Sequence, residues 1–231
     1  APGPRGHDRA PNPPRRPQTT IMAVSYDGGV VLGADSRTST GSYVANRATD
    51  KVTRVADAVF VCRSGSAADT QAIVAAAAMH LSSLAVEVGR PVGVAAAAKV
   101  IASMAYQNKD ALQAGMIVAG YDAADGGSVH AIPLGGTVLR VPYAVGGSGS
   151  AYITGLCEAG WRPGMSKADA VAFVRAAVAA AMARDGSSGG CVRTVAVDAA
   201  GVERGFVPGC DVAPSFGDMP LVGAAAAAGR A

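Results

Sequence analysis

The stretch TTIMAVSYDGGVVLGADSRTSTGSYVANRATDK, residues 19–51, governs how the rest of the chain is interpreted. Residues 21–26 and 30–34 are two short apolar runs around Asp27-Gly28-Gly29, a pattern that predicts a β-hairpin. The second run ends at a carboxylate, Asp35, and Lys51 follows later in the same stretch. This stretch therefore predicts a hairpin whose end meets an ionisable pair.

Thr19 is the candidate nucleophile of this stretch. A threonine hydroxyl needs a base beside it to attack a carbonyl near neutral pH. An α-amine titrates near pH 8, so a Thr at a chain terminus carries its own base. A nearby Lys51 would disfavour protonation of that amine, and Asp35 would balance the lysine charge. The alternative is that Asp35 only caps a strand and Lys51 is a solvated surface charge.

Five ordered blocks then carry a family resemblance. They are TTIMAVSYDGGVVLGADSRTSTGSY, NRATDK, CRSGSAADTQA, GGSGSAYI and RDGSSGG, which lie between residues 19 and 190. Together they resemble eukaryotic 20S proteasome beta subunits, most of all the caspase-like type that cleaves after acidic residues. The resemblance covers about residues 19–207. It implies a threonine peptidase of the N-terminal nucleophile hydrolases.

The resemblance assigns the catalytic residues by position. Gly65, at a strand-to-helix junction, would offer its backbone N–H to an oxyanion. Ser148 would be a hydrogen-bonding neighbour of the terminal threonine, although GGSGS alone also resembles a weak phosphate loop. Residues 185–190 by themselves indicate the Gly-rich end of a helix. The resemblance also places catalytic residues of this stretch beside the nucleophile. The full expected catalytic set is Thr19, Asp35, Lys51, Gly65, Ser148, Asp185 and Ser188.

Arg63 is the sharpest specificity signal. It ends an apolar run, and a partly buried Arg can bind a carboxylate bidentately; a lone strand-end charge is the alternative. By resemblance Arg63 lies at the base of the pocket for the residue before the cut. The loop 38–43 would pair with substrate backbone as an added strand. The expected substrate-binding set is Thr38, Thr40, Thr49, Arg63, Ala67 and Thr70.

Residues 1–18 are rich in Pro and Arg and have little to bury, which predicts a disordered leader. By resemblance this leader is a propeptide that blocks the Thr19 amine until it is removed. Active relatives usually have Gly before the nucleophile, whereas this chain has Gln18. That difference puts self-cleavage in question, and an internal Thr19 would have no free amine.

Composition predicts one domain over residues 19–211, followed by a tail over 212–231. The net charge of +3 is too small to indicate nucleic-acid binding. We expect no membrane span, no metal site and no cofactor. The four cysteines, without metal-site spacing, are expected to be reduced thiols in or near the core: Cys62, Cys157, Cys191 and Cys210.

The apolar periodicity predicts strands, two helices, strands, two helices and final strands, the order of an antiparallel α+β layered fold. The helices are expected from the capping pair Ser66/Asp69 through Val88, over residues 92–113, after residue 150, and from Ser166/Asp169 to Arg184. Residues 137–145 add strand character. The resembled family has a four-layer αββα sandwich.

The resulting hypothesis is a threonine endopeptidase subunit of the 20S proteasome core that acts in ubiquitin-dependent degradation. Its partners would be the other alpha and beta subunits in stacked rings, and its substrates unfolded polypeptides, in cytoplasm and nucleus. The alternative is an inactive structural beta-ring subunit that keeps its leader. A bacterial-type, self-assembling threonine protease is a third possibility.

Overall fold

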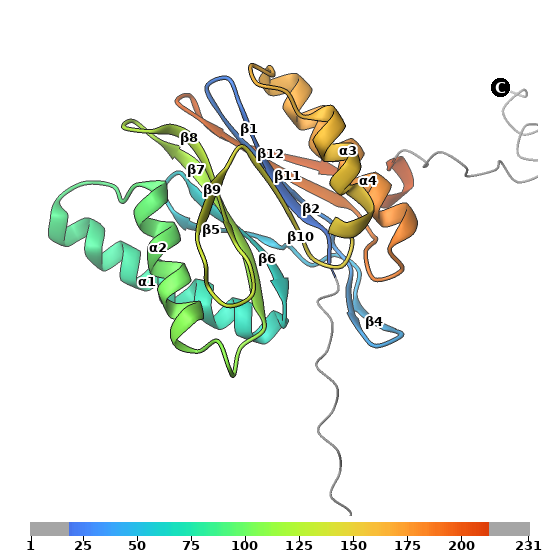
Figure 1. Ribbon diagram of the computed structural model, residues 1–231, viewed down its shortest axis with the longest axis horizontal. Coiled ribbons are helices and arrows are strands. Elements are labelled where there is room, and N and C mark those ends of the chain that lie inside the picture. The colour runs from blue at the N-terminus through green and yellow to red at the C-terminus, as the bar shows by residue number, and fades with distance from the viewer. Residues whose placement is uncertain (1–18, 213–231) are drawn as a thin grey trace, which may run out of the picture.

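The computed structural model describes residues 19–212, and the predicted leader and all but the first residue of the predicted tail lie outside the described residues. Two five-stranded sheets stack face to face, with one pair of helices on each outer side (Figure 1). Helices α1 and α2 cover one sheet and α3 and α4 cover the other. The four-layer αββα sandwich predicted from the resemblance is therefore confirmed.

The first sheet has the strand order β10-β1-β2-β11-β12, and all its neighbours are antiparallel. Its centre is the predicted hairpin, whose two-residue loop places Gly28 at φ 98°. Because only glycine adopts this φ without strain, Asp27-Gly28 sets the register. The strands are β1 (Ile21–Tyr26), β2 (Gly29–Ala34), β10 (Tyr143–Gly146), β11 (Val192–Asp198) and β12 (Gly201–Val207).

The second sheet has the order β5-β6-β7-β8-β9, and a separate hairpin, β3-β4, extends from the end of β2. The predicted strand over residues 137–145 is divided, because β9 and β10 belong to different sheets and Pro142 separates them. The bounds are β3 (Thr38–Thr40), β4 (Tyr43–Asn46), β5 (Val52–Ala56), β6 (Val59–Gly65), β7 (Ala114–Asp122), β8 (Gly126–Ile132) and β9 (Leu139–Val141).

The helices are α1 (Ala67–Val88), α2 (Val94–Gln107), α3 (Ser150–Gly160) and α4 (Lys167–Arg184); a 3-10 turn covers Gly209–Asp211. The predicted caps are confirmed, since Ser66 Oγ accepts from Asp69 N and Ser166 Oγ from Asp169 N. The prediction that α2 reaches residue 113 is wrong. Asn108 ends it by donating its side-chain amide to the Met104 carbonyl, a bond that satisfies a terminal carbonyl.

Helix α1 reaches Val88 as the sequence predicted, although Val88 itself is 48% exposed and the buried positions of the helix end at Leu81. By length and composition alone α1 could cross a membrane, which inspection of the sequence did not predict. Within the fold, Ile73, Val74 and Ala77 pack this helix against the sheet, although only 22% of its most apolar stretch is buried. A single such helix is weak grounds for a membrane span.

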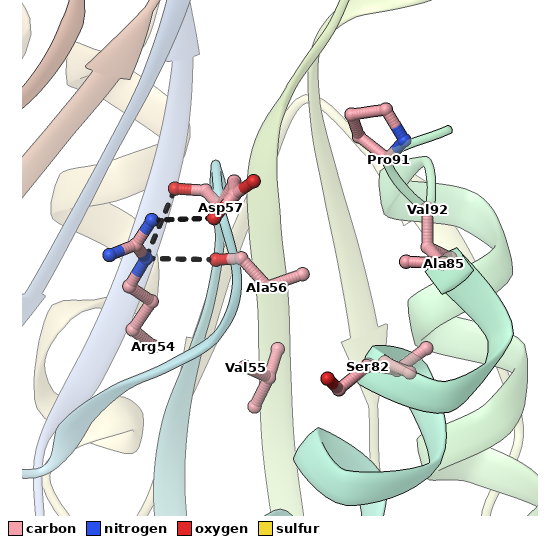
Figure 2. Close-up of a pocket in the computed structure, with 9 residues that line it drawn as sticks. Arg54, Val55, Ala56, Asp57, Ser82, Ala85, Pro91 and Val92 are labelled. Carbon is pink, nitrogen blue, oxygen red and sulfur yellow. Dashed lines mark hydrogen bonds and ion pairs between the residues drawn. The ribbon is translucent and has the colours of Figure 1, made fainter. Parts of the chain in front are cut away.

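A cavity of about 340 Å³ lies where the turn after β5 faces α1 and the α1–α2 connection (Figure 2). Arg54 and Asp57 form an exposed ion pair of 2.9 Å at its rim. Apolar and small residues complete the lining, which includes none of the residues that the sequence marks as catalytic or substrate-binding. The predicted chemistry therefore lies outside this cavity.

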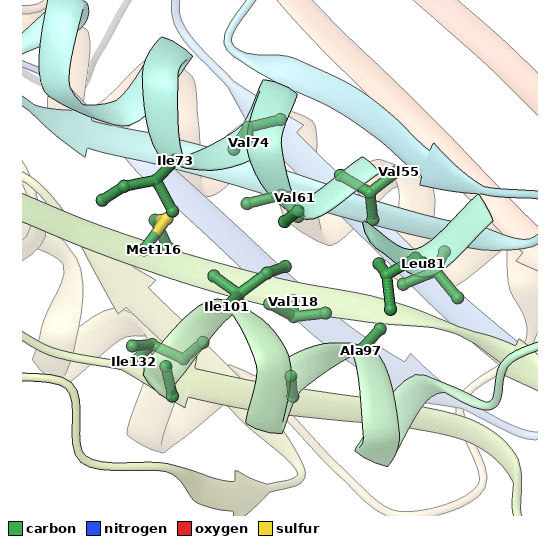
Figure 3. Packing of buried hydrophobic residues seen from close by; sticks show 14 of the residues in the cluster. Val55, Val61, Ile73, Val74, Leu81, Ala97, Ile101, Met116, Val118 and Ile132 are labelled. Atoms are coloured by element: carbon green, nitrogen blue, oxygen red, sulfur yellow. The ribbon is translucent and has the colours of Figure 1, made fainter. Parts of the chain in front are cut away.

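Three apolar clusters hold the four layers together. One joins α1 and α2 to the second sheet, with Ile101 and Val118 at its centre (Figure 3). A second lies between the sheets, and a third joins α3 and α4 to the first sheet. Three cysteines are buried and unpaired as expected, whereas Cys210 is exposed rather than in the core. Burial raises the pKa of Cys157 to about 11, so this thiol stays protonated at neutral pH.

Candidate active site

Asp35 and Lys51 are the centre of the candidate site. The Lys51 ammonium donates to Asp35 Oδ1 over 2.7 Å and to the Arg37 carbonyl over 2.6 Å. The Asp35 carboxylate is fully buried and also accepts three backbone N–H groups, from Thr20, Arg37 and Gly189. A buried carboxylate with this many donors is well stabilised as an anion.

Burial lowers the pKa of the Lys51 ammonium, and the adjacent Asp35 carboxylate opposes that change. The lysine side chain is 6% exposed, so few water molecules can screen its charge. Its positive charge is therefore felt by the groups at the start of β1, to which Asp35 is bonded through Thr20 N.

A second network approaches the start of β1 from the other half of the chain. Ser148 Oγ lies 3.1 Å from Thr19 N and donates to Asp185 Oδ2 over 2.7 Å. Ser188 Oγ donates to the same carboxylate oxygen over 2.6 Å. Since the Ser188 proton is used there, Thr20 Oγ1 must be the donor in its 2.7 Å bond to Ser188. Thr19 and Thr20 thus connect both networks.

Gly147 explains how Ser148 comes so close to Thr19. Its φ is 83°, and a Cβ on this residue would lie 2.1 Å from the Thr19 carbonyl oxygen. Only glycine fits both conditions. The next glycine, Gly149, donates its N–H to that same carbonyl over 3.1 Å. The GGSGS block is therefore a backbone clamp on Thr19.

Gly65 ends β6, immediately before α1, as the sequence predicted. Its φ is 109°, and a Cβ there would lie 2.1 Å from the Gln113 carbonyl oxygen. The fold itself therefore requires glycine at this position, independently of the oxyanion role expected for its N–H.

Arg63 lies on β6, two residues before Gly65, and is partly buried. Its guanidinium donates to Thr53 Oγ1 over 3.1 Å and to the Asp50 carbonyl over 2.8 Å. Burial lowers the pKa of Arg63, and the Asp50 charge opposes that change. Among the described residues no carboxylate forms an ion pair with Arg63, so its charge is available to an incoming anion.

The other predicted substrate-binding residues fall into two groups. Thr38 and Thr49 share a hydrogen bond of 2.9 Å between their hydroxyls, and Thr40 is exposed on β3. Ala67 is exposed at the first turn of α1. Thr70 is 2% exposed, and its hydroxyl donates to the Ser66 and Ala67 carbonyls. Its hydroxyl is therefore already occupied by the helix.

Sequence reasoning missed three participants. Thr20 bonds both Asp35 and Ser188, although only Thr19 was singled out. Ser36 is fully buried and accepts from Cys191 N over 2.9 Å while it donates to the Arg47 carbonyl. Arg37 donates to the Gly186 carbonyl over 2.9 Å. The ADSR motif was the available signal for Ser36 and Arg37, because three consecutive polar residues after a buried strand need partners.

Comparisons with known proteins agree with this arrangement. The sequence profile of the family described as "Proteasome subunit" matches residues 18–197. The chain is 52% identical over 191 residues to proteasome subunit beta type-6 of Arabidopsis thaliana, covering 83% of this chain and 82% of the relative. It is 53% identical over 186 residues to proteasome subunit beta type-1 of Saccharomyces cerevisiae, covering 80% and 86%.

Proteasome subunit beta type-9 of Homo sapiens is 44% identical over 200 residues, which cover 87% of this chain and 90% of the relative. The family match over residues 18–197 includes all four described helices and nearly all of both sheets, and β12 lies beyond it. The resemblance inferred from the five sequence blocks is confirmed, and the chain belongs to the proteasome beta-subunit family.

Proposed function

We propose that this chain is a threonine endopeptidase subunit of the 20S proteasome core that cleaves peptide bonds after acidic residues. The observation that carries the proposal is the joining of two buried networks at Thr19-Thr20, one through Asp35 and one through Ser188. Family membership supports assembly with other proteasome subunits. We extend this to unfolded polypeptides as substrates, and to the cytoplasm and nucleus as location.

Thr19 is the nucleophile in this proposal. The chain continues to Gln18, so the Thr19 nitrogen is a peptide nitrogen here. Cleavage of the 18–19 bond would turn the same atom into an amine, 3.1 Å from Ser148 Oγ. That amine takes the hydroxyl proton while Oγ1 attacks the substrate carbonyl. Lys51 keeps the amine neutral through like-charge repulsion, and Asp185 orients Ser148 and Ser188.

The tetrahedral intermediate carries an oxyanion, which the Gly65 N–H would bind. Collapse of the intermediate breaks the peptide bond, and the amine returns its proton to the leaving nitrogen. An ester on Thr19 Oγ1 remains, and water then attacks it with the same amine as base. Neither half-reaction needs a cofactor.

Specificity for acidic residues rests on Arg63 in this proposal. A partly buried guanidinium without a carboxylate partner in the described chain is suited to bind an Asp or Glu side chain. Thr38, Thr49, Ala67 and Thr70 would form the pocket wall around it. Thr40, exposed on β3, would pair with substrate backbone as an added strand.

A second candidate function is a structural ring subunit without activity. Gln18 favours it, because a side chain before the nucleophile crowds the carbonyl that self-cleavage must attack. In that case Thr19 keeps its peptide bond and has no base.

Replacement of the nucleophile tests the proposal. In the assembled particle Thr19→Ala should abolish cleavage after acidic residues and leave cleavage after basic residues intact. Thr19→Ser, which keeps a hydroxyl and an amine, should retain measurable post-acidic cleavage. Unchanged post-acidic cleavage by the Ala variant would contradict the proposal.

A further inference from the structure

Asp50, together with Thr53, holds the Arg63 guanidinium. Its carbonyl accepts from Arg63 Nη2 over 2.8 Å, so the backbone of residue 50 fixes the guanidinium. The same residue also carries a carboxylate. A carboxylate beside a specificity arginine is a competitor for any acidic substrate side chain, because both are attracted to the same cation.

That carboxylate already has other partners. Asp50 Oδ1 accepts from Val52 N over 2.9 Å, and Asp50 Oδ2 lies 3.3 Å from Arg204 Nη1. Arg204 comes from β12, the edge strand of the first sheet, whereas Asp50 precedes the edge strand of the second. The Asp50–Arg204 ion pair therefore connects the two sheets next to Arg63.

The Asp50 charge does reach Arg63. Burial lowers the pKa of the Arg63 guanidinium, and the negative charge of Asp50 is the largest influence that raises it again. Without another cation beside it, the Asp50 carboxylate would attract the Arg63 guanidinium and compete with other anions. When another cation pairs with Asp50, the Arg63 guanidinium is available to a different anion.

We propose that Arg204 is a specificity-determining positioning residue, which pairs with the Asp50 carboxylate and thereby leaves Arg63 free to bind the acidic side chain of the substrate. The inference rests on the proposed function and names the pair that sets its charge preference. Arg204 touches no reacting atom. Its guanidinium instead lies 5.5 Å from the centre of the Phe60 ring, which keeps it against β6.

The test uses assembled particles with Arg204→Gln, Asp50→Asn or both. Peptides that differ only by Asp or Asn, or by Glu or Gln, before the cut report charge preference as a ratio of kcat/KM. Arg204→Gln should lower the acid-to-amide ratio about three- to fivefold, the scale of one partly exposed ion pair. The effect should be in KM and should shrink at high salt.

Asp50→Asn in the Arg204→Gln background should restore the ratio, because the competing charge is gone. If the defect persists in the double variant, Arg204 attracts the substrate directly and the inference is wrong. Equal losses on acidic and amide peptides would indicate a structural role and also overturn it. An unchanged ratio in Arg204→Gln would do the same.

Arg54→Gln is the matched control, because Arg54, on β5, and Asp57, just after this strand, form another exposed Arg–Asp pair (Figure 2). It should leave the ratio unchanged. A Thr19→Ala particle measured in parallel reports on the proposed function alone. If post-acidic cleavage survives in the Thr19→Ala particle, both the enzyme assignment and this inference are wrong. If it is lost there but the acid-to-amide ratio of Arg204→Gln is unchanged, only this inference is wrong.

Discussion

Asp35 and Lys51 form a buried ion pair with 2.7 Å between Oδ1 and Nζ, and their side chains are 0% and 6% exposed. The two partners are not equivalent. Asp35 also binds three backbone N–H groups, whereas the Lys51 ammonium has, within residues 19–212, only the Arg37 carbonyl as a further partner. Loss of Asp35 and loss of Lys51 should therefore lower the free energy of unfolding by different amounts.

Asp35→Ala should lower the free energy of unfolding by about 3–5 kcal/mol, because it leaves a buried ammonium and three N–H groups unpaired. Lys51→Met should cost less, since the carboxylate keeps its three backbone donors. Urea denaturation at neutral pH measures both. Asp57→Ala, which breaks only the exposed pair with Arg54, should change stability by at most about 1 kcal/mol. A larger loss in Lys51→Met than in Asp35→Ala would contradict this account.

Ser148→Ala should lower kcat about 10- to 100-fold with little change in KM, because the amine of Thr19 would lose its positioning partner. Steady-state kinetics of assembled particles on a post-acidic peptide measures the effect. Ser25→Ala is the control, since the Ser25 hydroxyl also makes a hydrogen bond, to the Pro142 carbonyl, at the other end of β1. An effect confined to KM would argue against the proposed role of Ser148.

Gly147→Ala should be more damaging than Gly28→Ala. Both glycines have positive φ, but an added Cβ meets the Thr19 carbonyl at 2.1 Å in the first case and nothing within 4 Å in the second. Gly28→Ala should therefore cost only the backbone strain, about 1–2 kcal/mol. Gly147→Ala should cost more and abolish post-acidic cleavage. Thermal unfolding and peptide assays together measure this, and equal losses of stability would show that the clamp is unimportant.

Asp122 gives a pH-dependent prediction. Although burial would raise the pKa of Asp122, N–H donors from Asp125, Val94 and Ala124 lower it below its usual 3.8. Its bond to Val94 N caps α2, whose own N-cap, Gly93, has no side chain to do so. Asp122→Ala should cost about 1 kcal/mol at pH 7.

The sign of the pH dependence follows from the lowered pKa. The ionised carboxylate contributes its stability above pH 3.8, and this contribution is lost as the pH falls through the lower, folded-state pKa. The difference in unfolding free energy between wild type and Asp122→Ala should therefore narrow under acid conditions, measured by urea denaturation at several pH values. A difference that does not depend on pH would disprove the carboxylate cap.

Local patterns predicted most of the fold, because the Asp27-Gly28 turn and the Ser66 and Ser166 caps depend on neighbours in the chain. The predicted end of α2 was wrong because the apolar period does not indicate the C-cap at Asn108, whose side chain bonds the Met104 carbonyl. The division of residues 137–145 between two sheets depends on tertiary pairing, which no local pattern contains.

The candidate site shows the same limit on what local sequence patterns predict. Asp35 and Lys51 stand out in one stretch of sequence, and the structure joins them. The bond between Thr20 and Ser188 connects residues 168 positions apart, and nothing near either residue in sequence indicates which threonine hydroxyl takes part. The Asp50–Arg204 pair is likewise visible only when both sheets are in place.

The N-terminal residue of this subunit in the assembled particle tests the central claim most directly. N-terminal sequencing and intact-mass measurement should find Thr19 first, since the proposed base exists only when the 18–19 bond is broken. A subunit that keeps Gln18 bonded to Thr19 in the mature, post-acidic-cleaving particle would contradict the claim that one residue supplies both nucleophile and base.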